Sequence, residues 1–340
     1  MIVSNYVLIT IFILNFIFLI NFSKIKFFHL NIDRPDKKRK FHSKPTPLAG
    51  GTIIFFNLIF YWLIYQFYGK SLDDEIFFKD NYSFNLFIFV CLVVFLLGFI
   101  DDRINLKANF KFVVISLIVV VLLLLDENLI INEIEFSFYK RIFNLNHYSI
   151  FFSAFCFLVF INAFNMFDGI NLQSALYSLL IFFCIIFYYS DSLLIRILII
   201  SLVFFSYLNY KNKTFLGDSG TLLISFIIGY VFIKLYNLDY INYADEITLY
   251  MMIPGLELIR LFISRIANKK NPLTSDRNHL HHILIDKYSL KKTLLIIFSL
   301  ILLPLVLNYF QFYSLVTILT TIFVYFILLI YFSKKIKNFL

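Results

Sequence analysis

Residues 86–100 read LFIFVCLVVFLLGFI and lead directly into Asp101-Asp102, so an uncharged run of fifteen residues ends at two adjacent acids. Such a run predicts a transmembrane helix, because about 20 mostly apolar residues span the hydrocarbon core of a bilayer. Similar runs recur along the 340 residues, of which 61% are hydrophobic and 15% charged. Soluble domains carry about 25% charged residues. The composition therefore predicts a membrane protein.

Eleven such spans are predicted, which makes the fold class an all-α polytopic integral membrane protein. No polar stretch exceeds about 30 residues, so residues 1–340 form a single membrane-embedded domain without a soluble one. The three cysteines fall inside spans, which indicates buried thiols and no disulfide framework. The predicted spans cover about residues 5–22, 48–68, 85–100, 112–126, 149–164, 172–189, 193–209, 219–236, 247–264, 293–310 and 312–332.

Lys and Arg predict the orientation of these spans. The loops on one side hold 23 of the 30 basic residues and the loops on the other side hold four. Because basic loops stay in the cytoplasm, we expect the N-terminus outside and the C-terminus inside. The first positive charge, Lys24, follows the first run, an order that does not suit a cleaved signal peptide. The net charge of +9 follows from this orientation and favours anionic lipids and substrates, so no nucleic-acid partner is expected.

One outer loop shows a structural pattern. Residues 129–145 alternate partly between apolar and polar residues and are rich in strand formers, which predicts a small hairpin outside the membrane.

Five short polar segments hold nearly all the acids, histidines and amides that could do chemistry, and the span count puts all five on the cytoplasmic face. Each alone has an ordinary explanation: the acidic pair Asp101-Asp102, for example, is equally a solvated helix end or a metal- or phosphate-handling pair. Their coincidence on one face predicts an active site there. The segments are residues 37–51, 101–111, 162–171, 217–220 and 276–282.

Two of these segments suit a cation or an anionic ligand. Asn162, Asn165 and Asp168 share one face of a helix and need polar partners, which a hydrated cation, a nucleotide or a neighbouring span could supply. The string Gly217-Asp218-Ser219-Gly220 precedes a span, where Ser219 could cap the helix and free N–H groups favour an anion.

Three of the six histidines lie in Arg277-Asn278-His279-Leu280-His281-His282. Their spacing is too compressed for a closed tetrahedral zinc site, and no cysteine ligand accompanies them. Histidines beside an arginine suit a pyrophosphate better.

Together, these motifs resemble the polyprenyl-phosphate N-acetylhexosamine-1-phosphate transferases (glycosyltransferase family 4) over roughly residues 30–285. The first loop contributes Arg39-Lys40-Phe41-His42 and residues 45–51 (PTPLAGG) to this resemblance. With Pro254, Glu257 and Arg260 ahead of it, the histidine motif resembles the branch that transfers N-acetylglucosamine 1-phosphate. The phospho-N-acetylmuramoyl-pentapeptide transferases of peptidoglycan synthesis rank second.

The resemblance implies that undecaprenyl phosphate attacks the β-phosphate of a UDP-N-acetylhexosamine and releases UMP, as the first membrane step of a cell-surface polysaccharide such as lipopolysaccharide or capsule. It also implies Mg²⁺, with Mn²⁺ as a substitute, which offsets the repulsion of two polyanions. Residue by residue, it implies metal ligands at Asn165 and Asp218; lipid-phosphate positioning or deprotonation by Asp101 and Asp102; diphosphate contacts from His279, His281, His282 and Arg277; and substrate contacts from Lys44, Asn162, Asp168 and Asn171.

Two positions depart from the family pattern. Asn171 stands where bacterial members usually have Asp, which excludes a base or nucleophile role there, and Glu257 stands where Asp is commoner, which leaves the choice of sugar open. A transporter is the alternative from another class, but its polar residues should line a midplane path rather than gather at one interface. The expected location is the bacterial inner membrane, and a homodimer as well as a monomer fits the sequence.

Overall fold

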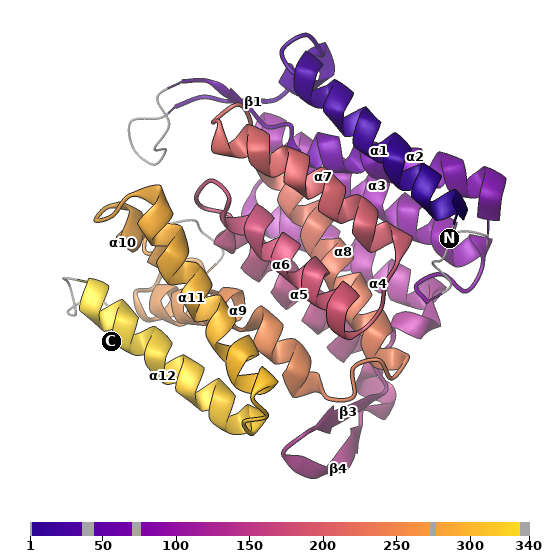
Figure 1. Ribbon diagram of the computed structural model, residues 1–340. Coiled ribbons are helices and arrows are strands. Elements are labelled where there is room, and N and C mark those ends of the chain that lie inside the picture. The colour runs from indigo at the N-terminus through magenta and orange to yellow at the C-terminus, as the bar shows by residue number, and fades with distance from the viewer. Residues whose placement is uncertain (1, 36–43, 70–75, 273–276, 334–340) are drawn as a thin grey trace.

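The computed structural model describes residues 2–35, 44–69, 76–272 and 277–333, and eleven long helices occur in them, one for each predicted span (Figure 1). Ten of these eleven are long and apolar enough to cross a membrane, whereas α6 has only 16 residues. The all-α polytopic class is confirmed, and a count of eleven crossings stays a prediction. The long helices are α1 (Ile2–Asn21), α2 (Gly50–Tyr68), α3 (Asn81–Ile104), α4 (Ala108–Leu125), α5 (Ser149–Phe167), α6 (Gln173–Tyr188), α7 (Leu193–Tyr210), α8 (Gly217–Asn237), α9 (Ala244–Ala267), α11 (Leu290–Tyr309) and α12 (Ser314–Phe332).

Short elements connect these helices. The predicted outer hairpin is present: β3 (Glu133–Phe136) pairs antiparallel with β4 (Tyr139–Asn144). A second ladder, β1 (Ile32–Asp33) with β2 (Thr46–Pro47), was not predicted, because two paired residues leave no alternation to detect. Among the described residues, the remaining elements are the helix α10 (Leu280–Ile285) and three 3₁₀ turns, η1 (Lys26–His29), η3 (Glu127–Leu129) and η4 (Asn146–Tyr148).

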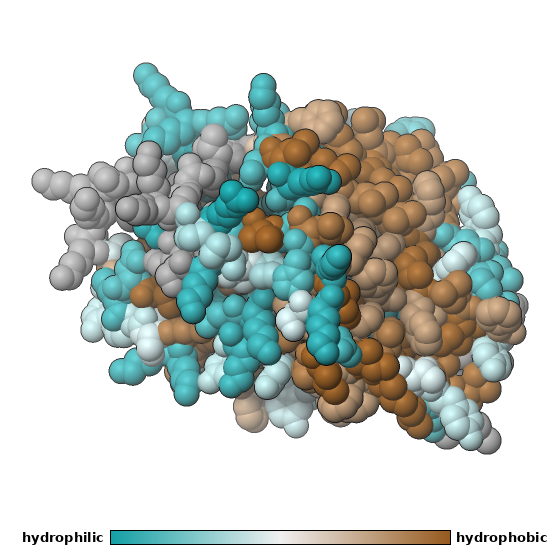
Figure 2. Space-filling view, turned by 90° about the horizontal axis from the view of Figure 1, so that it is seen from above, coloured by the Kyte–Doolittle hydropathy of each residue, from teal (hydrophilic) through white to brown (hydrophobic). Residues whose placement is uncertain are grey.

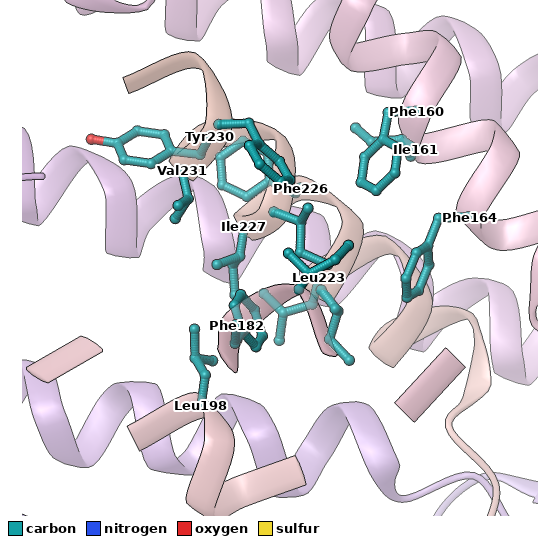
Figure 3. Close-up of a cluster of buried hydrophobic side chains, with 14 of the residues drawn as sticks. Phe160, Ile161, Phe164, Phe182, Leu198, Leu223, Phe226, Ile227, Tyr230 and Val231 are labelled. Atoms are coloured by element: carbon teal, nitrogen blue, oxygen red, sulfur yellow. The ribbon is translucent and has the colours of Figure 1, made fainter. Parts of the chain in front are cut away.

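Helix α8 forms the centre of the bundle and packs against α2, α3 and α5. In its most apolar stretch, 94% of the residues are buried, whereas 22% are buried in the corresponding stretches of α1 and α4. Aromatic rings fill the interior, as in the contact of Phe226 with Tyr230 at a centroid distance of 6.2 Å (Figure 3). The apolar helices therefore fall into two groups. Helix α8 is buried at the centre, whereas α1 and α4 belong to an outer layer whose exposed apolar side chains suit contact with lipid.

Polar surface gathers at one end of the bundle. Figure 2 shows a broad hydrophobic surface on one side of the molecule and a dense group of hydrophilic side chains on the other. The same end carries β1, β2 and α10, while β3 and β4 lie at the opposite end (Figure 1). The two ends of the described chain also lie at opposite ends of the bundle, as an odd number of crossings requires (Figure 1).

Helix α3 extends beyond its predicted bounds at both ends. At its start, the Asp80 carboxylate accepts a hydrogen bond from the Ser83 backbone at 2.8 Å, within a capping box. It ends at Asn105, which adopts a left-handed conformation with φ 51°. Asp101 and Asp102 therefore belong to the last helical turn and not to the loop in which the sequence analysis put them.

Cysteine labelling will test the orientation. Arg141, on the fully exposed strand β4, and Asn278, exposed at the other end, are suitable sites. In intact cells we expect an impermeant maleimide to label Arg141→Cys, and to label Asn278→Cys only after the membrane is opened. Labelling of Asn278→Cys from outside would overturn the proposal of a cytoplasmic site.

Candidate active site

All five polar segments meet at the end of the bundle that carries β1 and α10. A cavity of about 960 Å³ lies among them. Residues 37–43 and Asp276 fall outside the described residues, and with them the Arg39–His42 motif of the first loop. Of the residues predicted for the site, six line the cavity: Asp102, Asn165, Asp168, Asn171, Asp218 and, from α10, His282.

The start of α8 is built around a carboxylate from another helix. Asp102 accepts hydrogen bonds from the backbone N–H groups of Asp218 at 2.7 Å and Ser219 at 3.1 Å, and from the Ser219 hydroxyl at 2.8 Å. An acid is favourable there because the first N–H groups of a helix lack internal acceptors. Ser219 is therefore not the helix cap that the sequence analysis expected, since α8 begins two residues earlier, at Gly217.

Gly217 makes this contact possible. It has a φ of 74°, and a Cβ atom at this position would lie 2.7 Å from the Asp102 Oδ2 atom. A side chain there would be strained and would also collide with the carboxylate.

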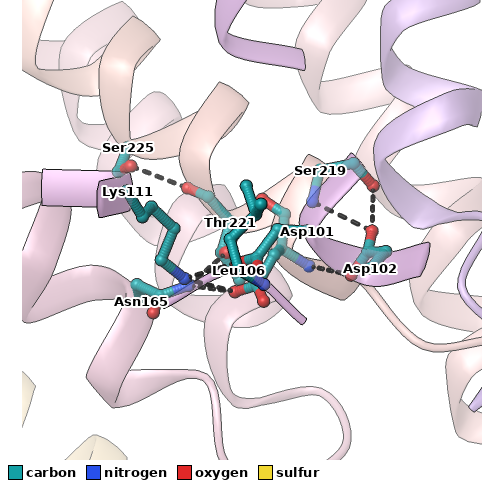
Figure 4. Close-up of polar contacts among 9 residues, drawn as sticks. Asp101, Asp102, Leu106, Lys111, Asn165, Ser219, Thr221 and Ser225 are labelled. Atoms are coloured by element: carbon teal, nitrogen blue, oxygen red, sulfur yellow. Dashed lines mark hydrogen bonds and ion pairs between the residues drawn. The ribbon is translucent and has the colours of Figure 1, made fainter. Parts of the chain in front are cut away.

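The two predicted metal ligands lie side by side. The Asn165 amide nitrogen donates to the Asp218 Oδ1 atom at 2.5 Å and to the Thr221 hydroxyl at 2.8 Å, which joins α5 to α8. The Asn165 oxygen points away from these hydrogen bonds (Figure 4), and the Asp218 side chain is 34% exposed in the cavity. Within the described ranges, no group of three or more His, Cys, Asp or Glu side chains is arranged around a common metal position.

This donor set fits Mg²⁺. An amide oxygen and a carboxylate oxygen are hard ligands, and Mg²⁺ in phosphate-transferring enzymes takes one or two protein oxygens, with the rest from phosphate and water. Asn165 and Asp218 can bind one Mg²⁺ together because their side chains are neighbours and both line the cavity.

Lys111 is a central residue to which the sequence analysis gave no role. Its ammonium group lies 2.7 Å from Asp101 Oδ2 and 3.6 Å from Asp218 Oδ1, with the side chain 18% exposed (Figure 4). The other Asp101 oxygen accepts from the Leu106 backbone at 2.7 Å. Asp101 is therefore fully engaged and buried, and of the acidic pair only Asp102 reaches the cavity. The sequence signal that could have pointed to Lys111 is its position as a single basic residue at the start of an apolar run.

The loop after α5 carries a second acid. Burial raises the pKa of Asp168 to about 7, with a further contribution from the negative charge of Asp218. Asn171 donates to the Asn212 side chain at 2.6 Å and to the Asn209 carbonyl at 3.2 Å, so its amide is held at the cavity wall. Asn162, in contrast, donates to the Leu158 carbonyl of its own helix at 2.7 Å and does not line the cavity.

Three histidine rings form a cluster in the histidine segment, which comprises residues 277–288. The His281 ring stacks on the His279 ring and meets the His282 ring edge-on, at centroid distances of 5.0 and 4.3 Å. Burial holds the pKa of His281 well below its usual range, and the neighbouring histidines and Arg260 lower it further, so this ring is neutral at pH 7. Only His282 of the three lines the cavity, and neither Arg277 nor Lys44, both exposed, does so.

Gly169 lies directly against this cluster. A Cβ atom on Gly169 would lie 1.8 Å from the His281 Nε2 atom, so only glycine allows the loop after α5 to touch the histidine segment.

Comparisons with known proteins identify relatives over most of the chain. Residues 84–236 match the family model described as glycosyl transferase family 4. The undecaprenyl-phosphate alpha-N-acetylglucosaminyl 1-phosphate transferase of Thermotoga maritima is 30% identical over 279 residues, which cover 79% of this chain and 77% of that protein. The proteins of the same name from Salmonella typhi and Salmonella typhimurium are 23% identical over 290 residues, which cover 82% of this chain and 75% of each.

Proposed function

Because the chain belongs to glycosyl transferase family 4, we propose that it transfers N-acetylglucosamine 1-phosphate to undecaprenyl phosphate. The observation that carries this proposal is the convergence of Asp102, Asn165, Asp168 and Asp218 on one cavity, in a chain whose relatives over most of its length bear that activity in their names. The chain is a multi-pass membrane protein, and we place it in the bacterial inner membrane with the cavity on the cytoplasmic face.

The donor in this proposal is UDP-N-acetylglucosamine. A phosphate oxygen of undecaprenyl phosphate forms a bond to the β-phosphorus of the donor. The bond from that phosphorus to the oxygen bridging the two phosphates breaks, and UMP leaves with that oxygen. Both substrates are anionic, so the site must offset their repulsion before they can react.

Asn165 and Asp218 would hold Mg²⁺. When bound, the ion would stabilise the negative charge on the diphosphate oxygens. Asp102 fixes the position of Asp218 through its three hydrogen bonds to the start of α8. Lys111 carries a positive charge 2.7 Å from Asp101 and 3.6 Å from Asp218, where it offsets the repulsion between these two carboxylates.

His282 and Asp168 face the cavity from its other sides. His282 suits a contact to the donor diphosphate, since an imidazole N–H can donate to a phosphate oxygen. Asp168 suits a contact to the uracil, whose ring N–H needs an acceptor. The loop that holds Asp168 also holds Asn171, whose amide is fixed by Asn209 and Asn212.

The raised pKa of Asp168 predicts a pH dependence. The carboxyl group is protonated below about pH 7 and ionised above it. If the ionised form accepts from uracil, kcat/KM for the donor will rise about tenfold per pH unit up to about pH 7 and then level off, because kcat/KM reports the pKa values of the free enzyme. Asp168→Asn, which cannot titrate, should lose this acidic limb. If kcat/KM of Asp168→Asn still falls below pH 7 as in the wild type, another group causes the pH dependence.

The decisive test of the proposal is a reaction with purified protein, undecaprenyl phosphate and Mg²⁺. UMP release is measured with UDP-N-acetylglucosamine, UDP-N-acetylgalactosamine and UDP-N-acetylmuramoyl-pentapeptide as separate donors. We expect release with the first donor and a lipid product that carries a pyrophosphoryl sugar. Release with the pentapeptide donor alone would replace this proposal with the peptidoglycan branch, and no release with any donor would reject it.

A further inference from the structure

The histidine segment is anchored by a buried cluster that does not line the cavity. Glu257 of α9 lies beneath the start of α10, where its Oε2 atom accepts from the Leu280 backbone N–H at 3.1 Å. Arg260, one turn along α9, donates to the Asn278 carbonyl at 2.8 Å. Glu257 and Arg260 are 3% and 8% exposed and form an ion pair at 3.0 Å. Both ends of this ion pair therefore hold the backbone of the histidine segment.

A residue from the last long helix completes the cluster. The Tyr325 hydroxyl of α12 accepts from the Arg260 Nε atom at 3.0 Å and donates to the Glu257 Oε1 atom. Tyr325 is fully buried, at 0% exposed. It thus contacts both charged residues that hold the segment, and no motif in the sequence pointed to it.

The same helix also contacts the far end of the segment. The Lys287 ammonium group donates to the Phe332 carbonyl in the last turn of α12, and the Tyr288 ring packs edge-on against the Phe332 ring at a centroid distance of 5.7 Å. Helix α12 is therefore tied to both the beginning and the end of the region that presents His282 to the cavity.

From these contacts we infer that Tyr325 is a positioning residue for the transfer reaction: through Glu257 and Arg260 it holds the histidine segment in place. This inference rests on the proposed function for the reaction concerned, but the anchoring itself does not. Glu257 keeps its ion pair with Arg260 when the Tyr325 hydroxyl is removed, so the loss should be moderate rather than complete.

The test compares two conservative variants of α12. Tyr325→Phe removes only the buried hydroxyl, and Tyr331→Phe makes the same change on the same helix at a side chain that is 76% exposed. Each variant also carries Leu280→Cys, since Leu280 is 2% exposed and reacts with a maleimide only when the segment moves away. Mass spectrometry of the peptide containing position 280 separates this label from the three native cysteines.

We expect Tyr325→Phe to raise the labelling rate at position 280 about tenfold over Tyr331→Phe, which corresponds to about 1.4 kcal/mol. In variants that keep Leu280, Tyr325→Phe should lower kcat for UMP release about tenfold with both KM values within twofold, because the substrates still bind while the reactive geometry is populated less often. Tyr331→Phe should match the wild type in both measurements.

Each result has a separate meaning. Equal labelling rates in the two backgrounds would overturn the anchoring. Faster labelling with unchanged kcat would overturn the positioning role. A wild-type protein that releases no UMP would reject the proposed function, while the labelling comparison would still decide the anchoring.

A second pair of variants covers the case in which Tyr325→Phe does not fold, as judged by gel filtration. Lys287→Gln removes the contact to Phe332 from an exposed residue, and Lys291→Gln makes the same change at an exposed position of α11. Faster labelling at position 280 in Lys287→Gln than in Lys291→Gln supports anchoring by α12, and equal rates overturn it.

Discussion

Asp218→Ala will lower turnover by about 10³-fold or more, since it removes the carboxylate that we assign to Mg²⁺. Asp218 is the acid whose side chain opens into the cavity beside Asn165, and its own backbone N–H already binds Asp102. The substitution leaves that backbone contact in place, so α8 should keep its start while the site loses its charge. The measurement is steady-state release of UMP with saturating Mg²⁺.

Two controls accompany this variant. Asp286→Ala removes an exposed acid at the end of α10 and should leave turnover within about twofold of the wild type, as exposed charges contribute little. In the wild type, a chelator should abolish activity, and Mg²⁺ or Mn²⁺ should restore it. Near-normal turnover in Asp218→Ala would remove this residue from the metal site.

His282→Ala should lower kcat by about 10²- to 10³-fold, because a donor aimed at charge that develops on a phosphate contributes a few kcal/mol to catalysis. It is the histidine of the segment that lines the cavity. His279 lies behind it, 3.7 Å from Glu257, so His279→Ala should act through the position of the segment and cost less.

The control for His282→Ala is a substitution of a basic residue close to the histidine segment in the sequence. Lys270 is exposed and lies just ahead of the segment, so Lys270→Ala should leave kcat nearly unchanged. If His282→Ala and Lys270→Ala turn over alike, the histidine segment is only an orientation signal and the diphosphate contacts lie elsewhere.

The helices were predictable from the sequence because membrane spans are local: an apolar run such as residues 86–100 forms a helix wherever it packs. The outer hairpin was predictable for the same reason, since the alternation in residues 129–145 records a strand pair. The gathering of Asp102, Asp168 and Asp218 followed from counting spans, because each lies next to the end of a span that the count put on the same side.

The contacts within the site were not predictable, because they join positions that are distant in the sequence. Asp102 binds the start of α8 across 116 residues, and Tyr325 reaches Glu257 across 68. Lys111 pairs with Asp101 only because α3 ends in a tight turn at Asn105. A single sequence shows that these side chains are polar and near a helix end, but not which of them are neighbours.

The short helix α6 has a consequence for the lipid around it. Sixteen residues rise about 24 Å, some 6 Å less than a typical hydrocarbon core. Such a hydrophobic mismatch is relieved by thinning of the adjacent leaflet or by polar groups held within it. Beside the start of α6, the Asn171 side chain donates hydrogen bonds to the Asn209 carbonyl and the Asn212 side chain. We therefore expect a thinner bilayer beside α6, which would let the phosphate of a long-chain lipid approach the cavity while its tail remains in the membrane.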